Sequence, residues 1–124
     1  MVKIAIIICC FLKCALFISL CADDVCPSSK VCQVAVMLDL SGSQKSLGQQ
    51  ALNGFLLAIQ NASPEVMKNI AIRIINTQSD QRLTKKLAQD IAPSISFATG
   101  FTDSGSVLAC GTVFEKYEVP FLSI

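Results

Sequence analysis

The chain has 124 residues, of which 52% are hydrophobic and 15% charged, and its formal net charge is +1. This length suits one small domain rather than two. Because the chain contains no histidine, the common Ser-His and Cys-His catalytic schemes and mixed Cys/His metal sites are excluded. A near-neutral chain without a basic run offers nucleic acid no binding surface. We expect no cofactor.

The first 22 residues have the pattern of a secretory signal peptide. Lys3 is followed by an almost continuous apolar stretch up to Ala22, and an acidic pair ends it. An uncleaved membrane anchor and a buried helix are the alternatives, and Lys13 in the middle disfavours the anchor. Cys21 lies where a lipoprotein signal is modified, but the bulky Leu20 before it does not fit that pattern.

We therefore expect an exported protein, periplasmic or secreted. Its predicted parts are a signal peptide at 1–22, a short leader at 23–33 and a domain at 34–124. Four of the seven cysteines lie in the signal peptide, so its removal leaves Cys26, Cys32 and Cys110. Cys26 and Cys32 either close a short disulfide loop in an oxidising compartment or remain free thiols, and Cys110 falls in a predicted helix.

The first predicted unit is a strand, a polar loop and a helix. Residues 34–38 are continuously apolar, as in a parallel strand covered on both faces. The loop at 39–46 is polar and contains glycine, and a helical apolar stripe follows over 47–61. In such units ligands bind beyond the carboxyl ends of the strands, so this loop is expected to form one wall of any site.

Asp39, at the end of the first strand, is expected to bond backbone N–H groups of its own loop. It could instead act as a nucleophile in phosphate chemistry, but no second acid lies two residues on and no phosphate-binding motif is present. We therefore expect no enzyme.

The second unit comprises a strand at 70–76 and a helix at 81–91. Arg73 indicates that this strand has a face or edge in solvent, and Asp80 is placed to cap the helix. Leu83, Leu87 and Ile91 form the expected inner side of the helix, and Pro93 ends it.

The third unit is a strand at 95–99, a polar loop at 100–106 and a helix at 107–117, and a fourth strand is predicted at 119–124. Asp103 is expected to bond backbone N–H groups before the helix. The alternation of strands and helices predicts an α/β fold with a mostly parallel sheet.

Five short motifs in order over 34–124 resemble type I periplasmic solute-binding proteins. The nearest branch is the branched-chain amino-acid binding proteins of ABC transporters, which also resemble the ligand-binding region of some receptors. The motifs are Leu40-Ser41-Gly42; Leu47-Gly48 through Gly54 with Leu57-Ala58; Asn76-Thr77-Gln78-Ser79-Asp80; Gly100 with Ser104 and Ser106; and Val119-Pro120-Phe121-Leu122-Ser123. No single motif is specific, and the resemblance rests on their order and spacing.

The resemblance implies a partial doubly wound three-layer α/β/α lobe with about four parallel strands. In that family two lobes close around a small polar solute, here an amino acid or similar molecule, and pass it to the membrane subunits of an ABC transporter. The loop after the third strand supplies hydroxyl and N–H groups to the ligand carboxylate. The residues that the resemblance places at the ligand are Ser104, with Ser106 and Thr102 beside it, then Ser41 and Gly42 as a second wall, and Ser123 at the start of the next loop.

The sequence also departs from the family. Such proteins are much longer, and this chain covers only the first part of the first lobe, without the second lobe or the acid that binds a ligand's amino group. We therefore expect a truncated member with weak or no activity on its own.

A second resemblance concerns Asp39, Ser41 and Ser43. Their Asp-x-Ser-x-Ser spacing resembles the metal-dependent adhesion motif of von Willebrand factor A domains, which would imply a Mg²⁺ site. The short distance in sequence from Asp39 to Asp103 and the missing hairpin between them favour the solute-binding family.

Overall fold

The structure, a computed structural model, describes residues 31–124. The predicted signal peptide, most of the leader and Cys26, with its proposed bridge to Cys32, lie outside the described residues and stay predictions. Between residues 31 and 124, no helix combines the length and hydropathy needed to cross a membrane.

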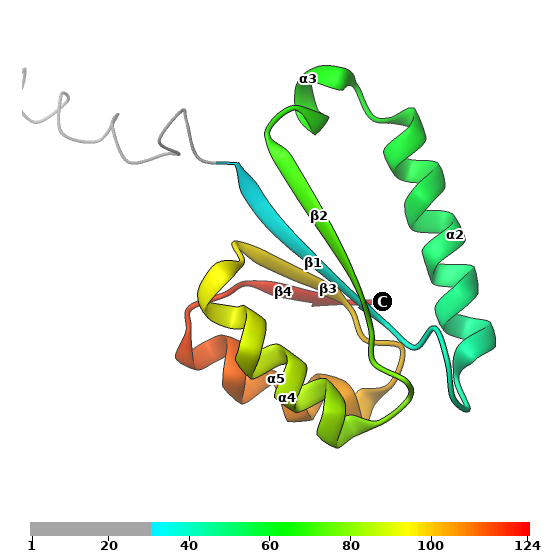
Figure 1. The fold of residues 1–124 in the computed structure, drawn as a ribbon, viewed down its shortest axis with the longest axis vertical. Helices are drawn as coiled ribbons and strands as arrows, with labels where there is room; N and C mark the ends of the chain where they lie inside the picture. Colours follow the sequence, from blue (N-terminus) through cyan, green and yellow to red (C-terminus); the bar gives the residue numbers. More distant parts are fainter. Residues whose placement is uncertain (1–30) are drawn as a thin grey trace, which may run out of the picture. The chain divides into compact units, whose positions relative to one another are not determined.

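Four parallel strands form one sheet in the order β2-β1-β3-β4 (Figure 1). They are β1 (Cys32–Leu38), β2 (Ile70–Asn76), β3 (Phe97–Gly100) and β4 (Phe121–Ser123). The predicted parallel α/β class is confirmed, and Arg73 is exposed on β2, an edge strand. β3 begins later than predicted because a 3-10 turn, η1 (Ala92–Ser94), follows the preceding helix.

Four α-helices connect or follow these strands. They are α2 (Lys45–Asn61), α3 (Pro64–Met67), α4 (Gln81–Ile91) and α5 (Ser104–Lys116). The sequence does not predict α3, because Ser63 and Pro64 are also turn-forming residues. In the structure Ser63 caps the helix and Pro64 takes its first position, which both residue types favour. α5 begins three residues earlier than predicted because Asp103 caps it.

Helices α4 and α5 cover one face of the sheet, where the main hydrophobic core lies (Figure 1). Phe114 of α5 is fully buried, and its ring centroid lies 5.9 Å from that of Phe101 and 5.5 Å from that of Phe121. On α4 the deepest side chains are Thr84, Ala88 and Ile91, whereas the predicted Leu83 and Leu87 are only half-buried. Because Thr84 and Ala88 are small, α4 can approach the sheet closely.

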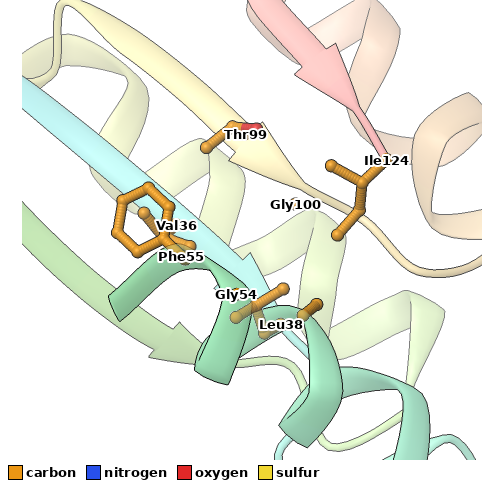
Figure 2. Close-up of a pocket in the computed structure, with 8 residues that line it drawn as sticks. Val36, Leu38, Gly54, Phe55, Thr99, Gly100 and Ile124 are labelled. Carbon is orange, nitrogen blue, oxygen red and sulfur yellow. The ribbon is translucent and has the colours of Figure 1, made fainter. Parts of the chain in front are cut away.

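Helix α2 covers the opposite face much less completely. Of its 17 residues only Gly48 is buried, and Leu57 is 60% exposed. Successive strand residues point to opposite faces, so Val36 turns toward α2 while Ala35 and Met37 belong to the other core. The resulting groove has a volume of about 200 Å³ and is lined by α2 residues such as Phe55 and by the ends of β1 and β3. Figure 2 shows the side chains that line it.

Candidate functional site

The carboxyl ends of β1, β2 and β3 lie level with one another, which brings the three following loops together. Leu38 pairs with Asn76, and Met37 pairs with Gly100. The loops that follow contain Ser41, Gly42 and Thr102, and Ser104 is the first residue of α5. This edge of the sheet is where open α/β folds bind ligands, and it is therefore the candidate site.

Asp39 joins all three loops. Its side chain is buried, with 2% exposure. One carboxylate oxygen accepts hydrogen bonds from the Thr77 hydroxyl and from the Ser79 N–H, the latter at 2.9 Å, and the other oxygen accepts from the Thr102 hydroxyl. The prediction that Asp39 bonds N–H groups of its own loop is wrong, because each of these donors comes from a neighbouring loop. A buried carboxylate needs such donors to offset its lost hydration.

A second set of bonds ties the loop after β1 to the loop after β2. The Ser41 hydroxyl accepts from the Asn76 amide at 3.0 Å, and the Ser41 carbonyl accepts from the Ser79 hydroxyl at 3.1 Å. Ser79 also accepts from the Gln44 N–H at 2.9 Å. Gly42 has φ +86, and a Cβ there would come within 2.4 Å of the Gln78 carbonyl oxygen, so only glycine allows this approach.

The start of α5 is capped by its own chain. The Asp103 carboxylate accepts from the Ser106 N–H at 3.0 Å and from the Gln81 side chain at 3.3 Å, which confirms the predicted bonding of Asp103 to backbone N–H groups. Partial burial by itself would raise the pKa of Asp103, but the hydrogen-bond donors of Ser106, Gly105 and Gln81 outweigh it, and the pKa is lowered.

The predicted ligand residues do not all reach this edge in the same way. Ser104 is exposed at the first position of α5, and Thr102 is half-buried and bonded to Asp39. Ser106 is 3% exposed, and its hydroxyl finds no hydrogen-bond partner among the described residues. Ser123 is exposed on β4, where it pairs with Gly100. The structure thus brings Ser41, Thr102 and Ser104 to one edge, and turns the Ser106 side chain inward.

The alternative metal site would use Asp39, Ser41 and Ser43. Both carboxylate oxygens of Asp39 are already hydrogen-bonded, and the Ser41 hydroxyl is engaged by Asn76. The geometry therefore gives the adhesion reading no support.

A small cavity of about 150 Å³ opens between the loops, lined by Ser43, Gln44, Ser79, Gln81 and Asp103. Sequence reasoning missed Gln44 and Gln81 as site residues. Only their positions could have indicated this role. Gln44 lies in the loop after the first predicted strand, and Gln81 starts the helix after the second. Thr77 was also missed as a partner of Asp39, because the pairing of two loops 38 residues apart is not encoded locally.

No protein-family model and no curated protein sequence matches the chain. Solved structures do match it. The isoleucine-bound branched-chain amino acid substrate-binding protein LivJ from Streptococcus pneumoniae has a TM-score of 0.67 and 19% identity, over 76% of this chain and 28% of its own. The leucine binding protein LivK from Thermotoga maritima has a TM-score of 0.69 and 19% identity, over 75% of this chain and 27% of its own.

The fold is that of a periplasmic binding-protein lobe. An ABC transporter substrate-binding protein from Sphaerobacter thermophilus agrees, with a TM-score of 0.66 and 20% identity, over 74% of this chain and 26% of its own. The chain thus spans about a quarter of the length of the solved structures that it matches. The family resemblance read from the five sequence motifs is confirmed at the level of the fold.

Proposed function

We propose that the chain is a solute-binding component of an extracytoplasmic ABC transport system, and that its ligand is an amino acid or a similar small molecule. The observation that carries this proposal is the convergence of three polar loops at the carboxyl edge of the sheet, held together by Asp39. The proposal is supported by the likeness to amino-acid binding proteins. Its partners would be the solute and the transporter's membrane subunits.

Ser104 is the proposed main contact of the ligand carboxylate. Its hydroxyl is exposed at the first position of a 13-residue helix, where N–H groups and the helix dipole favour negative charge. Thr102, Ser41 and Gly42 would form the adjacent wall, with Ser123 at its margin. Ser106 is proposed to act only through the shape of the loop, because its side chain is buried and its N–H donates to Asp103.

Titration calorimetry of the purified chain with leucine, isoleucine and valine tests the proposal. The described loops form one wall of a site, and binding without enclosure leaves few contacts to offset the cost of association. We therefore expect dissociation constants in the millimolar range, and no response to a neutral sugar.

Ser104→Ala should weaken amino-acid binding about two- to tenfold, as the loss of one hydrogen bond does. Ser94→Ala is the control, because this exposed serine lies in η1, at the opposite end of β3. No response to any of the three amino acids, or equal effects of the two substitutions, would contradict the proposal.

A further inference from the structure

The sheet has two outer strands, β2 and β4, and their free edges present different groups. On β2, Arg73 is exposed in the middle of the strand. A charged side chain at such a place opposes the addition of another strand and is a common protection of sheet edges. Two copies that met through the middle of β2 would also bring two arginines face to face, which is unfavourable. This edge is therefore protected against self-association.

The other outer strand, β4, lacks this protection. From Phe121 to Ser123 it contains neither a charged residue nor a proline. No strand within residues 31–124 pairs with its outer side. Leu122 of the strand and Ile124 just after it are 61% and 66% exposed. An unprotected edge with exposed apolar side chains tends to pair with a further strand.

The hydrogen bonds of β4 show which of its backbone groups are free. Toward β3, the Pro120 C=O accepts from an N–H at 3.1 Å, the Leu122 C=O accepts from a hydroxyl at 3.0 Å, and the Ile124 N–H donates to a C=O at 3.1 Å. Successive residues of a strand turn their backbone groups to alternate sides. Phe121 and Ser123 therefore direct their N–H and C=O groups away from the sheet.

A second copy of β4 matches these free groups when it runs antiparallel to the first. With Leu122 opposite Leu122 of the second copy, Phe121 of each copy lies opposite Ser123 of the other. Opposite residues whose backbone groups face each other exchange both N–H···O bonds in an antiparallel ladder. Every free group of the two edges thus finds a partner, and the arrangement has the two-fold symmetry of most homodimers.

The same register also suits the side chains. Leu122 lies on the α2 face, because it pairs with Thr99, which lines both grooves of that face. Ile124 lines the first of these grooves (Figure 2). Antiparallel pairing brings the two Leu122 side chains together and sets each Ile124 opposite Pro120 of the other copy. This row of side chains is apolar throughout. Pro120 needs no N–H there, because its pair forms no hydrogen bond across the interface.

We infer that the chain self-associates through β4, and that the partner is a second copy of this chain paired antiparallel. The pairing joins two four-stranded sheets into one continuous sheet, with the two candidate sites at its opposite ends. A strand of three residues offers far less than the roughly 800 Å² per partner of a standard interface. We therefore expect a weak dimer, with a dissociation constant of about 0.1 mM.

Sedimentation velocity of the purified chain, at concentrations below and above this value, tests the inference. We expect a monomer that converts to a dimer, and to nothing larger, as the concentration rises. Leu122→Lys should weaken the dimer about tenfold or more, because it replaces an apolar pair by two like charges directly opposite each other. The fold should remain intact, since Leu122 is exposed on an edge strand.

Leu57→Lys is the matched control. It makes the same change at a position of α2 that is 60% exposed, against 61% for Leu122, and it should leave the equilibrium unchanged. Hydrogen exchange measured by NMR at low and high concentration reports on β4 itself. The outward amides of Phe121 and Ser123 should exchange more slowly as the dimer forms, whereas the amide of Ile124, already bonded to β3, should change little.

Three results would each overturn the inference. The first is a chain that stays monomeric at every concentration. The second is a dimer that Leu122→Lys weakens no more than Leu57→Lys does, which would assign the contact to a surface other than β4. The third is growth into open-ended assemblies, which would mean that β4 pairs with β2 of the next copy despite Arg73.

Discussion

The two faces of the sheet differ in how completely they are covered. On the α4–α5 face, Met37, Ala98 and Phe114 are fully buried. On the α2 face, a helix of 17 residues buries a single glycine, and two apolar grooves of about 200 and 310 Å³ remain. A parallel sheet normally has both faces covered. The difference indicates that the stability of this unit comes mainly from one face.

The largest expected effect comes from Phe114→Ala. The ring is fully buried and contacts the rings of Phe101 and Phe121, so its removal should lower the free energy of unfolding by about 3–5 kcal/mol. Phe55→Ala on the half-open α2 face should cost only about 1–2 kcal/mol, because solvent already reaches that ring. Urea unfolding monitored by circular dichroism measures both. Equal losses would contradict the one-sided distribution of stability.

Asp39→Ala should have the next largest effect. The substitution removes the hydrogen-bond acceptor shared by Thr77, Ser79 and Thr102. Because their buried donors are then unpaired, the free energy of unfolding should fall by about 1–3 kcal/mol. Asp39→Asn keeps the shape and one carbonyl oxygen, so its loss should be smaller.

Thermal unfolding of both Asp39 variants, with and without magnesium chloride, is the measurement. A magnesium-dependent stabilisation of the original chain that disappears in Asp39→Ala would revive the metal-dependent adhesion reading. We expect no such stabilisation, because the carboxylate oxygens are occupied.

Two glycines of α2 differ in their surroundings, because one packs against the loop after β1 and the other faces open space. A Cβ at Gly48 would come within 2.1 Å of the Asp39 carbonyl oxygen, whereas a Cβ at Gly54 meets nothing within 4 Å. Gly48→Ala should therefore lower stability by about 1–3 kcal/mol despite alanine's higher helix propensity. Gly54→Ala should raise stability by up to about 1 kcal/mol. Chemical denaturation of the pair checks this, and a loss at Gly54 would show that α2 packs more closely than its exposure indicates.

The strands and helices could be predicted because their signals are local. The apolar run of β1, the capping residues Asp80 and Asp103, and the stop at Pro93 each act over a few residues. The short helix α3 was missed because its start signals, Ser63 and Pro64, are also turn signals.

The sequence predicts where in the fold the candidate site lies, but not which of its residues contact one another. The resemblance predicts Ser104 at the carboxyl edge of the sheet, and the structure has it there at the start of α5; the strand order brings three loops side by side. The bonds of Asp39 to Thr77 and Thr102 depend on strand register, which no local pattern encodes. For the same reason the sequence could not show that Gln44, Gln81 and Asp103 line one cavity.

The smallest expected effect concerns the reactivity of the cysteine thiols. Cys110 of α5 is fully buried; burial, with a smaller contribution from the negative charge of Asp103, raises the pKa of its thiol to about 11. The reactive thiolate is therefore a fraction on the order of one in a thousand at pH 8. In reduced protein, alkylation mapped by mass spectrometry should modify the half-buried Cys32 first, and Cys110 only when α5 opens.

The same labelling tests whether the faces open independently. Phe114→Ala loosens the packing around Cys110, so it should speed the labelling of that thiol. Phe55→Ala perturbs only the α2 face and should leave the rate unchanged. If Phe55→Ala also speeds Cys110 labelling, in proportion to its loss of global stability, α5 is exposed only by global unfolding, and the sheet couples the two faces more strongly than their unequal burial implies.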